Sequence, residues 1–135
     1  PDIGMYTSVE TGDCSIRNAF AANDAVSFGS IINAYTQPFL LLYNHRKDRG
    51  YRMEAFAKAI RQSVAKPVCI GVIGEHKKAC ARYMQRTTGI QAQAVEQPKE
   101  WIQAQNVRHV LCAGNIKGEG RQFLEEMIEE ARQNV

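Results

Sequence analysis

Short apolar segments alternate with amphipathic segments along most of this chain. A continuous apolar run occupies residues 39–43, and apolar segments rich in branched side chains predict further strands at 67–73 and 107–113. Runs of this length are typical of strands that are buried on both faces of a sheet. Between them, apolar residues recur every three or four positions, which indicates helices with one buried face. The alternation therefore predicts an α/β fold in which a mostly parallel, Rossmann-like sheet is flanked by helices.

Turn and capping signals predict the remaining elements. Residues 3–9 and 15–20 flank a Thr11-Gly12-Asp13 turn, which predicts an N-terminal β-hairpin. A shorter, more polar strand at 90–95 is expected near an edge of the sheet. Helices are predicted to begin at Asn23 or Asp24, to include 53–64, to follow Gly74, and to cover 98–105 and 118–134. Among the helical residues, Val64 and Ala79 are expected to face the core.

Composition and charge narrow the function classes. The length of 135 residues suits a single domain, and no apolar run approaches the roughly 20 residues of a membrane-spanning helix. Seventeen basic against fourteen acidic side chains give a net charge of +3, too small and dispersed to predict a nucleic-acid partner. The four cysteines match neither zinc-ligand spacing nor a dense disulfide framework, so free thiols in a reducing cytoplasm and no metal site are expected.

Unusual polar residues collect where the predicted strands end. In open parallel sheets the ligand crevice lies beyond the carboxyl ends of the strands, so these positions are the candidate binding residues. The candidates are Asn18, Asn23 and Asp24 after the hairpin, Asn44, His45, Arg46, Lys47 and Arg49 after the next strand, and Gly114, Asn115 and Gly118 after the last strand.

The segment after residue 43 is strongly basic. Arg46, Lys47, Arg49 and Arg52 are opposed only by Asp48. Arginine forks match phosphate and carboxylate oxygens, and a strand-to-helix turn adds main-chain N–H groups and the positive end of the helix dipole. The segment therefore indicates an anion site, or alternatively a solvated charged surface.

The other two polar segments also leave two interpretations open. Glycines at 114, 118 and 120 allow close approach of an anion, but the dinucleotide pattern G-x-G-x-x-G is absent, and an ordinary turn explains them equally well. Asn23 and Asp24 are explained by helix capping. Together with Asn18 and Asn44 they could instead orient a ligand or a bound cation.

Sequence motifs for covalent catalysis and for phosphate binding are absent. There is no G-x-S-x-G nucleophile motif, and no G-x-x-x-x-G-K-[ST] loop that cradles phosphates. If the protein uses ATP, another domain must hold most of the phosphate.

Three segments carry a family resemblance. They are Asn18-Ala19-Phe20-Ala21-Ala22-Asn23-Asp24 followed by Ser27, Leu42-Tyr43-Asn44 followed by Arg46, Asp48 and Arg49, and Gly114-Asn115 with Gly118 and Gly120. From about residue 14 onward, the chain resembles the C-terminal part of the poly-γ-glutamate synthase family (PgsB/CapB), whose members are relatives of the Mur ligases.

The resemblance implies an ATP-dependent amide ligase. ATP phosphorylates a γ-carboxylate of glutamate, the amino group of the next glutamate attacks the acyl phosphate, and poly-γ-glutamate is formed as a capsule polymer. The chain would be the C-terminal domain cut from a larger ligase, inactive by itself. One implied partner is the central ATPase domain, which would make most of the contacts with ATP and Mg²⁺. The others are glutamate and its polymer, and membrane-bound capsule-synthesis subunits. The implied location is the cytoplasm, at the inner face of the cell membrane.

The resemblance also implies roles for the candidate residues. Arg46, Arg49 and Lys47 would stabilise negative charge when the domains close, and Asn23 and Asp24 would orient the attacking ammonium or a metal-bound water. The remaining candidates would contact substrate or nucleotide; they are Asn18, Asn44, His45, Gly114, Asn115 and Gly118.

Two other functions remain open on the sequence alone. One is a stand-alone Rossmann-like module that binds an anion or nucleotide without catalysis. The other is an assembly domain that docks onto membrane partners through the basic segment containing Lys77, Lys78, Arg82 and Arg86, although such a segment is also typical of a solvated helix face.

Overall fold

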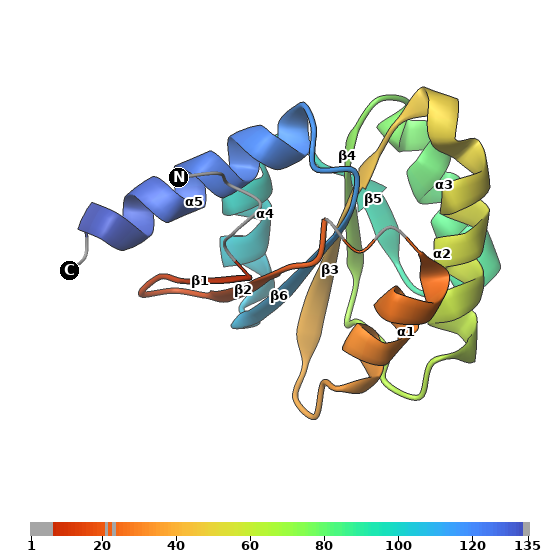
Figure 1. Ribbon diagram of the computed structural model, residues 1–135, viewed down its shortest axis with the longest axis horizontal. Coiled ribbons are helices and arrows are strands. Elements are labelled where there is room, and N and C mark those ends of the chain that lie inside the picture. The colour runs from red at the N-terminus through yellow and green to blue at the C-terminus, as the bar shows by residue number, and fades with distance from the viewer. Residues whose placement is uncertain (1–6, 21, 23, 134–135) are drawn as a thin grey trace.

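Six strands form one sheet in a computed structural model, which describes residues 7–20, 22 and 24–133. The strands are β1 (Ser8–Glu10), β2 (Ser15–Asn18), β3 (Phe39–His45), β4 (Ile70–Gly74), β5 (Ala92–Ala94) and β6 (His109–Gly114). The helices are α1 (Ala25–Asn33), α2 (Gly50–Gln62), preceded by the 3-10 turn η2 (Lys47–Arg49), α3 (Lys77–Thr88), α4 (Pro98–Gln105) and α5 (Glu119–Gln133). Figure 1 shows the helices flanking the sheet.

The sheet has the order β1-β2-β6-β3-β4-β5. Only β1 and β2 pair antiparallel, as the N-terminal hairpin, and the other neighbouring strands are parallel. The hairpin turn forms because the hydroxyl of Thr11 accepts hydrogen bonds from the main-chain N–H groups of Asp13 and Cys14, at 3.3 and 3.0 Å. The predicted α/β fold with an N-terminal hairpin is therefore confirmed, and β5 lies at an edge as expected. The first part of the predicted 3–9 strand, through residue 6, lies outside the described residues.

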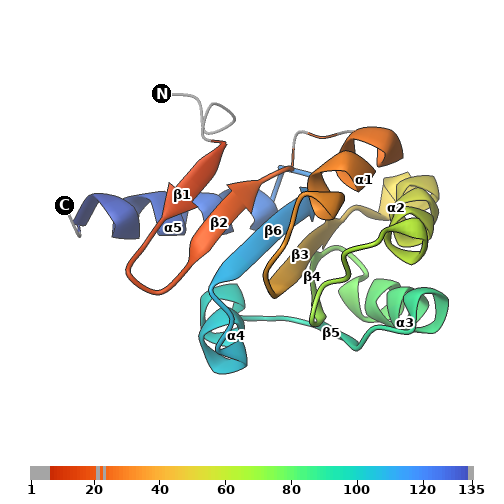
Figure 2. The ribbon, with the colours of Figure 1, turned by 90° about the horizontal axis from the view of Figure 1, so that it is seen from below.

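Separate apolar cores cover the two faces of the sheet. Helices α1, α2 and α3 pack on one face, where Phe28, Phe56 and Met84 meet alternate residues of β3, β4 and β6. Helices α4 and α5 pack on the other face through Trp101, Phe123 and neighbouring side chains. Figure 2 shows the helices on their respective sides of the sheet. Because both faces are covered, β3 is buried at all seven positions, which explains its continuous apolar sequence.

Two predicted core positions are wrong. Helix α2 ends at Gln62, and Val64 is 92% exposed in the following turn. The hydroxyl of Ser63 lies 2.7 Å from the carbonyl oxygen of Ile60 and 2.6 Å from that of Ala65, and it stabilises the turn by donating its one proton to either of them. Ala79 is exposed on α3, whose buried residues are Cys80, Ala81 and Met84. The apolar periodicity identified both helices, but it extended α2 beyond its end and placed one exposed residue of α3 on the buried face.

All four cysteines are free, as predicted, and the structure buries all four. No helix among the described residues combines the length and apolar character needed to cross a membrane.

Candidate functional site

The five parallel strands end along one edge of the sheet, and the ends of β3 and β6 carry most of the predicted site residues. Asn44 at the end of β3 is paired in register with Gly114 at the end of β6, and His45 is paired with Gly74 at the end of β4. Figure 1 shows the starts of α2, α3 and α5 above these strand ends. We call residues 44–49, 74–77 and 114–119 the strand-end edge. The structure thus brings together Asn44, His45, the basic segment, Gly114, Asn115 and Gly118.

Asn44 lies beneath this edge, and its hydrogen bonds connect β3 to the turn before α5. Its side chain is buried, and its amide donates hydrogen bonds to the main-chain carbonyl oxygens of Asn115 and, at 2.7 Å, Lys117. The main-chain N–H of Asn115 in turn donates a hydrogen bond to the main-chain carbonyl oxygen of Asn44 at 2.9 Å. Both donors of the Asn44 side chain are therefore engaged inside the protein, and the residue positions the turn before α5.

Glycines permit this close approach of main chains. Gly74 and Gly114 have positive φ angles of 95° and 93°. A side chain at Gly74 would collide with the carbonyl oxygen of His45, and one at Gly114 with that of Asn44. The glycines at these strand ends are required by backbone packing, so their presence alone does not indicate an anion site.

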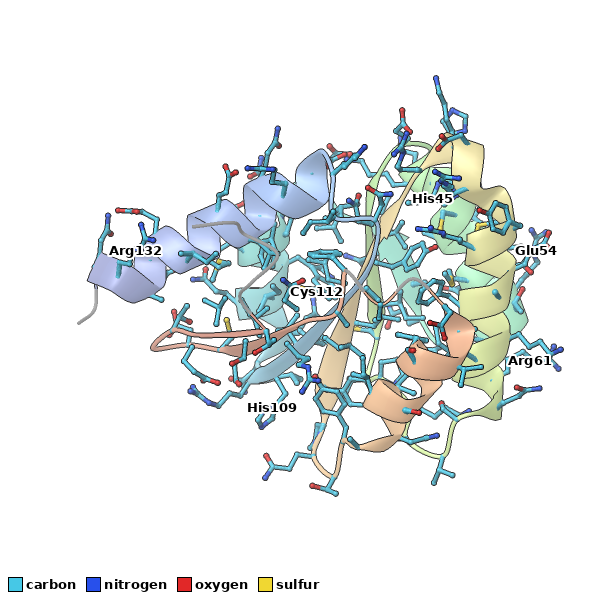
Figure 3. All side chains as sticks on the ribbon, viewed as in Figure 1. His45, Glu54, Arg61, His109, Cys112 and Arg132 are labelled. Carbon is cyan, nitrogen blue, oxygen red and sulfur yellow. The ribbon has the colours of Figure 1, made fainter. Side chains whose placement is uncertain are left out.

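His45 is held with one ring nitrogen bonded and the other without a hydrogen bond. Its Nδ1 lies 2.7 Å from the carbonyl oxygen of Glu75. Because a carbonyl oxygen only accepts, Nδ1 carries the proton. The Nε2 atom is buried and has no hydrogen-bond partner among the described residues. Figure 3 shows His45 at this edge, whereas His109 lies at the opposite end of the sheet, where its ring bonds to Gln37 at 2.9 Å.

The basic segment forms the exposed rim of the edge. Arg46 pairs with Asp48 at 3.2 Å, and its side chain is 30% exposed. Lys47 is exposed, and its main-chain N–H donates to the carboxylate of Glu75 at 3.2 Å. Arg49 contacts the hydroxyl of Tyr51 at 3.5 Å through one terminal nitrogen, and its Nε has no hydrogen-bond partner among the described residues. Lys47 and Arg49 thus have charged groups that no described carboxylate neutralises.

Lys77 and Glu119 form a link across the edge that the sequence analysis missed. The ammonium of Lys77 at the start of α3 lies 3.1 Å from the carboxylate of Glu119 at the start of α5, and 3.1 Å from that of Glu96. Glu119 also accepts a hydrogen bond from the N–H of Gly74 at 2.9 Å. Burial opposes the charge of Lys77, but hydrogen bonds and charge attraction from Glu119 and Glu96 raise its pKa above the ordinary value. An acidic residue in the first turn of a helix was the only signal in the sequence for this link.

The segment between β2 and α1 is organised by local hydrogen bonds. Asn18 accepts a hydrogen bond from the N–H of Phe20 at 3.2 Å through its side-chain oxygen. Asp24 caps α1, accepting from the N–H and hydroxyl of Ser27 at 2.8 and 2.9 Å. Asn23 lies outside the described residues. The capping interpretation of Asp24 is thus confirmed, whereas contacts of these residues with a ligand remain predictions.

The last turn leads directly into α5. Asn115 accepts a hydrogen bond from the N–H of Lys117 at 2.8 Å, and Gly118 adopts a positive φ of 61°. The carbonyl oxygen of Gly118 accepts from the N–H of Gln122, so Gly118 stands at the cap of α5. Helix α5 thus starts at the same edge as α2 (Figure 1), and the positive ends of the helix dipoles favour negative charge there.

A family model now accounts for these segments. The model of the poly-gamma-glutamate synthase CapB C-terminal domain matches residues 6–130. The chain belongs to this family. The resemblance noted in the sequence is thereby confirmed over nearly the whole chain. A comparison with curated proteins finds no match.

The carboxylates at the edge of this CapB-type domain contact cations and a main-chain N–H group. No group of three or more His, Cys, Asp or Glu side chains within the described residues could hold a metal ion. Asp48 faces Arg46, Glu119 faces Lys77, and Glu75 accepts from the N–H of Lys47. The carboxylates of this edge are thus engaged with neighbouring groups of the same edge.

Proposed function

We propose that this domain is one part of an ATP-dependent amide ligase that builds poly-γ-glutamate. In this reaction ATP transfers its γ-phosphoryl group to a γ-carboxylate of glutamate and leaves as ADP. The amino group of the next glutamate then attacks the acyl carbon, an amide bond forms, and inorganic phosphate and a proton leave. Membership of the CapB C-terminal family is the observation that carries this proposal.

The cationic rim suits the phosphoryl-transfer step. Negative charge spreads over the transferred phosphoryl oxygens, and positioned cations stabilise it more effectively than covalent chemistry. Arg49 is the best-placed residue, because its buried Nε, beside the start of α2, has no hydrogen-bond partner among the described residues. Lys47 is exposed next to it, and Arg46 can exchange its surface partner Asp48 for a phosphate. Arg46, Lys47 and Arg49 therefore act together in our proposal when the edge meets the nucleotide.

The proposal divides the work between two domains. The central ATPase domain holds most of the ATP and its Mg²⁺, since this chain has neither a phosphate-cradling loop in its sequence nor a cluster of metal-ligating side chains among its described residues. This domain closes over the nucleotide with its strand-end edge, and closure excludes water from the acyl phosphate. We further propose that the complete enzyme makes poly-γ-glutamate at the inner face of the cell membrane, together with membrane-bound partner subunits.

Substitution of Arg49 in the complete synthase tests the proposed role of the edge. We expect Arg49→Ala to lower glutamate-dependent ATP hydrolysis by about 100-fold, the typical cost of removing one donor to a developing anion. Arg61→Ala is the matched control, because Arg61 is exposed on the outer side of α2 near its last turn (Figure 3). Equal rates in the two variants would refute the role of Arg49. The 135-residue chain alone is expected to hydrolyse no ATP, and turnover by it would contradict the division of labour.

A further inference from the structure

Helix α3 carries a row of exposed cations that starts at the strand-end edge. Lys78, Arg82 and Arg86 are spaced four positions apart and are exposed. The helix sequence 77–88 contains no acidic residue, and no ion pair found among the described residues includes any of these three side chains. Residues four apart lie on neighbouring turns of one helix face, so the row runs along α3, away from the edge.

A shallow groove lies beside this row. Its volume is about 270 Å³, and it lies between α3 and the edge strand β5. It is lined by Lys78, Ala81, Arg82, Gln85, Ala92, Gln93 and Ala94, without a carboxylate. Figure 2 shows α3 and β5 side by side at the end of the sheet opposite the hairpin. Gln85 accepts a hydrogen bond from the main-chain N–H of Ala92 at 3.0 Å, which caps part of the open strand edge. The groove therefore suits recognition by side-chain cations and amides better than addition of another strand.

We propose that the groove and the row Lys78, Arg82 and Arg86 bind the newly made poly-γ-glutamate chain as it leaves the strand-end edge. The inference rests on the proposed function, which supplies the polymer. A chain with one carboxylate in each residue complements a surface that presents three cations and no carboxylate. Because the row begins next to Lys77 at the edge, a product held on it remains close to the site where the next residue is added.

The spacing of the cations matches the γ-linked polymer. Four helical residues rise by about 6 Å. An α-linked residue spans at most about 3.3–3.6 Å, and the two extra carbon–carbon bonds of a γ-linkage extend the repeat to about 6 Å. Successive carboxylates of the γ-linked chain can therefore lie near successive cations of the row.

An anionic membrane is the less suitable occupant. Membrane-surface helices insert large apolar side chains beside their basic residues. The exposed large apolar residues described in the structure are Val26, Tyr51, Val64 and Val68, and none belongs to α3 or β5. The cation row therefore has no apolar anchor next to it.

Fluorescence anisotropy with a dye-labelled γ-linked glutamate hexamer tests binding to the 135-residue chain. We expect K78Q/R82Q/R86Q to weaken binding by about tenfold, as the sum of three exposed ion pairs. The control R17Q/K58Q/R61Q removes the same charge from exposed residues elsewhere and should change the affinity by less than about twofold. Circular dichroism verifies that both variants are folded.

Two results would overturn the proposal. One is an equal loss of affinity in the two triple variants. The other is tight binding to vesicles of phosphatidylcholine containing about a third phosphatidylglycerol, with no binding of the hexamer. In the complete synthase, K78Q/R82Q/R86Q should shorten the polymer but leave the rate of the first ligation unchanged. If Arg49→Ala abolishes ligation while the hexamer does not bind, only this inference fails. If Arg49→Ala leaves ligation intact, the proposed role of the edge fails instead.

Discussion

The side-chain amide of Asn44 donates a hydrogen bond of 2.7 Å to the carbonyl oxygen of Lys117, a residue 73 positions later in the chain. The same amide donates to the carbonyl oxygen of Asn115. These bonds fasten the end of β3 to the turn before α5, so one buried side chain fixes the distance between the basic segment and the start of α5. The geometry of the edge therefore depends on a residue that a ligand does not need to touch.

Asn44→Ala should destabilise the domain. The substitution leaves two main-chain carbonyl oxygens without their donor in a partly buried environment, at a cost of about 1–3 kcal/mol. Urea unfolding followed by circular dichroism measures the loss. Gln103→Ala is the control, because Gln103 is an exposed amide on α4. A variant as stable as this control would show that the Asn44 bonds contribute nothing to the free energy of unfolding.

Gly120→Ala should also destabilise the domain, through the same side chain. A β-carbon at position 120 would lie 2.5 Å from Nδ2 of Asn44 and 2.8 Å from the carbonyl oxygen of Asn115. Because these two atoms are the donor and the acceptor of the hydrogen bond that holds the turn, we expect a loss of about 1–3 kcal/mol in urea unfolding. Gly29→Ala is the matched control within α1, where a β-carbon meets no atom within 4 Å. It should stabilise the domain by about 0.5–1 kcal/mol, since alanine favours the helix. A neutral Gly120→Ala would contradict the crowding.

The sequence was sufficient to predict the fold because each core strand is buried on both faces. Continuous apolar runs such as 39–43 arise only where helices cover both sides of a sheet, and this fixes the α/β class. The end of α2 was not predictable from periodicity alone. Val64 continues the apolar spacing, but the hydrogen bonds of Ser63 end the helix before it. Local hydrogen bonding therefore decided the boundary.

The location of the candidate site was predictable, and its internal bonding was not. Parallel strands end at one edge, so Asn44, His45, Gly114 and Asn115 had to come together once the topology was known. That Asn44 faces inward and that Lys77 pairs with Glu119 depend on the packing of α3 and α5, which no local pattern encodes. The chemical roles of Arg46, Lys47, Arg49 and the other candidates stay predictions.

The four cysteines should be unreactive in the folded chain. Burial raises the pKa of each thiol, to about 12 for Cys80, and the side chains are shielded from solvent. Because the thiolate is the reactive form, we expect less than about one thiol per chain to react with Ellman's reagent at pH 8 within minutes. In guanidinium chloride all four should react. Cys69, at 8% exposure, should be the first to react, so Cys69→Ala is the informative variant. Rapid native-state modification of Cys112 would contradict its burial.

Asp24 offers a pH-dependent test of the α1 cap. Hydrogen bonds from the main chain and hydroxyl of Ser27 hold the pKa of Asp24 below its ordinary value of 3.8. The unfolded chain therefore takes up the proton first as the pH falls. The stabilisation by the carboxylate is full above pH 3.8 and is lost as the pH falls through the folded-state pKa. The difference in unfolding free energy between the unmodified chain and Asp24→Ala should shrink accordingly. A difference that grows towards low pH would refute the charged cap.

Asp24→Asn separates this cap from the proposed role of Asp24 in the reaction. Asparagine keeps an oxygen that accepts from the N–H of Ser27, so the variant should retain most of the stability that Asp24→Ala loses. It lacks the negative charge that would orient an attacking ammonium. In the complete synthase, a stable Asp24→Asn enzyme with a much lower rate of glutamate-dependent ATP hydrolysis would support a role in the reaction. A stable variant with an unchanged rate would show that Asp24 serves only to begin α1, and that the orientation of the nucleophile depends on other residues.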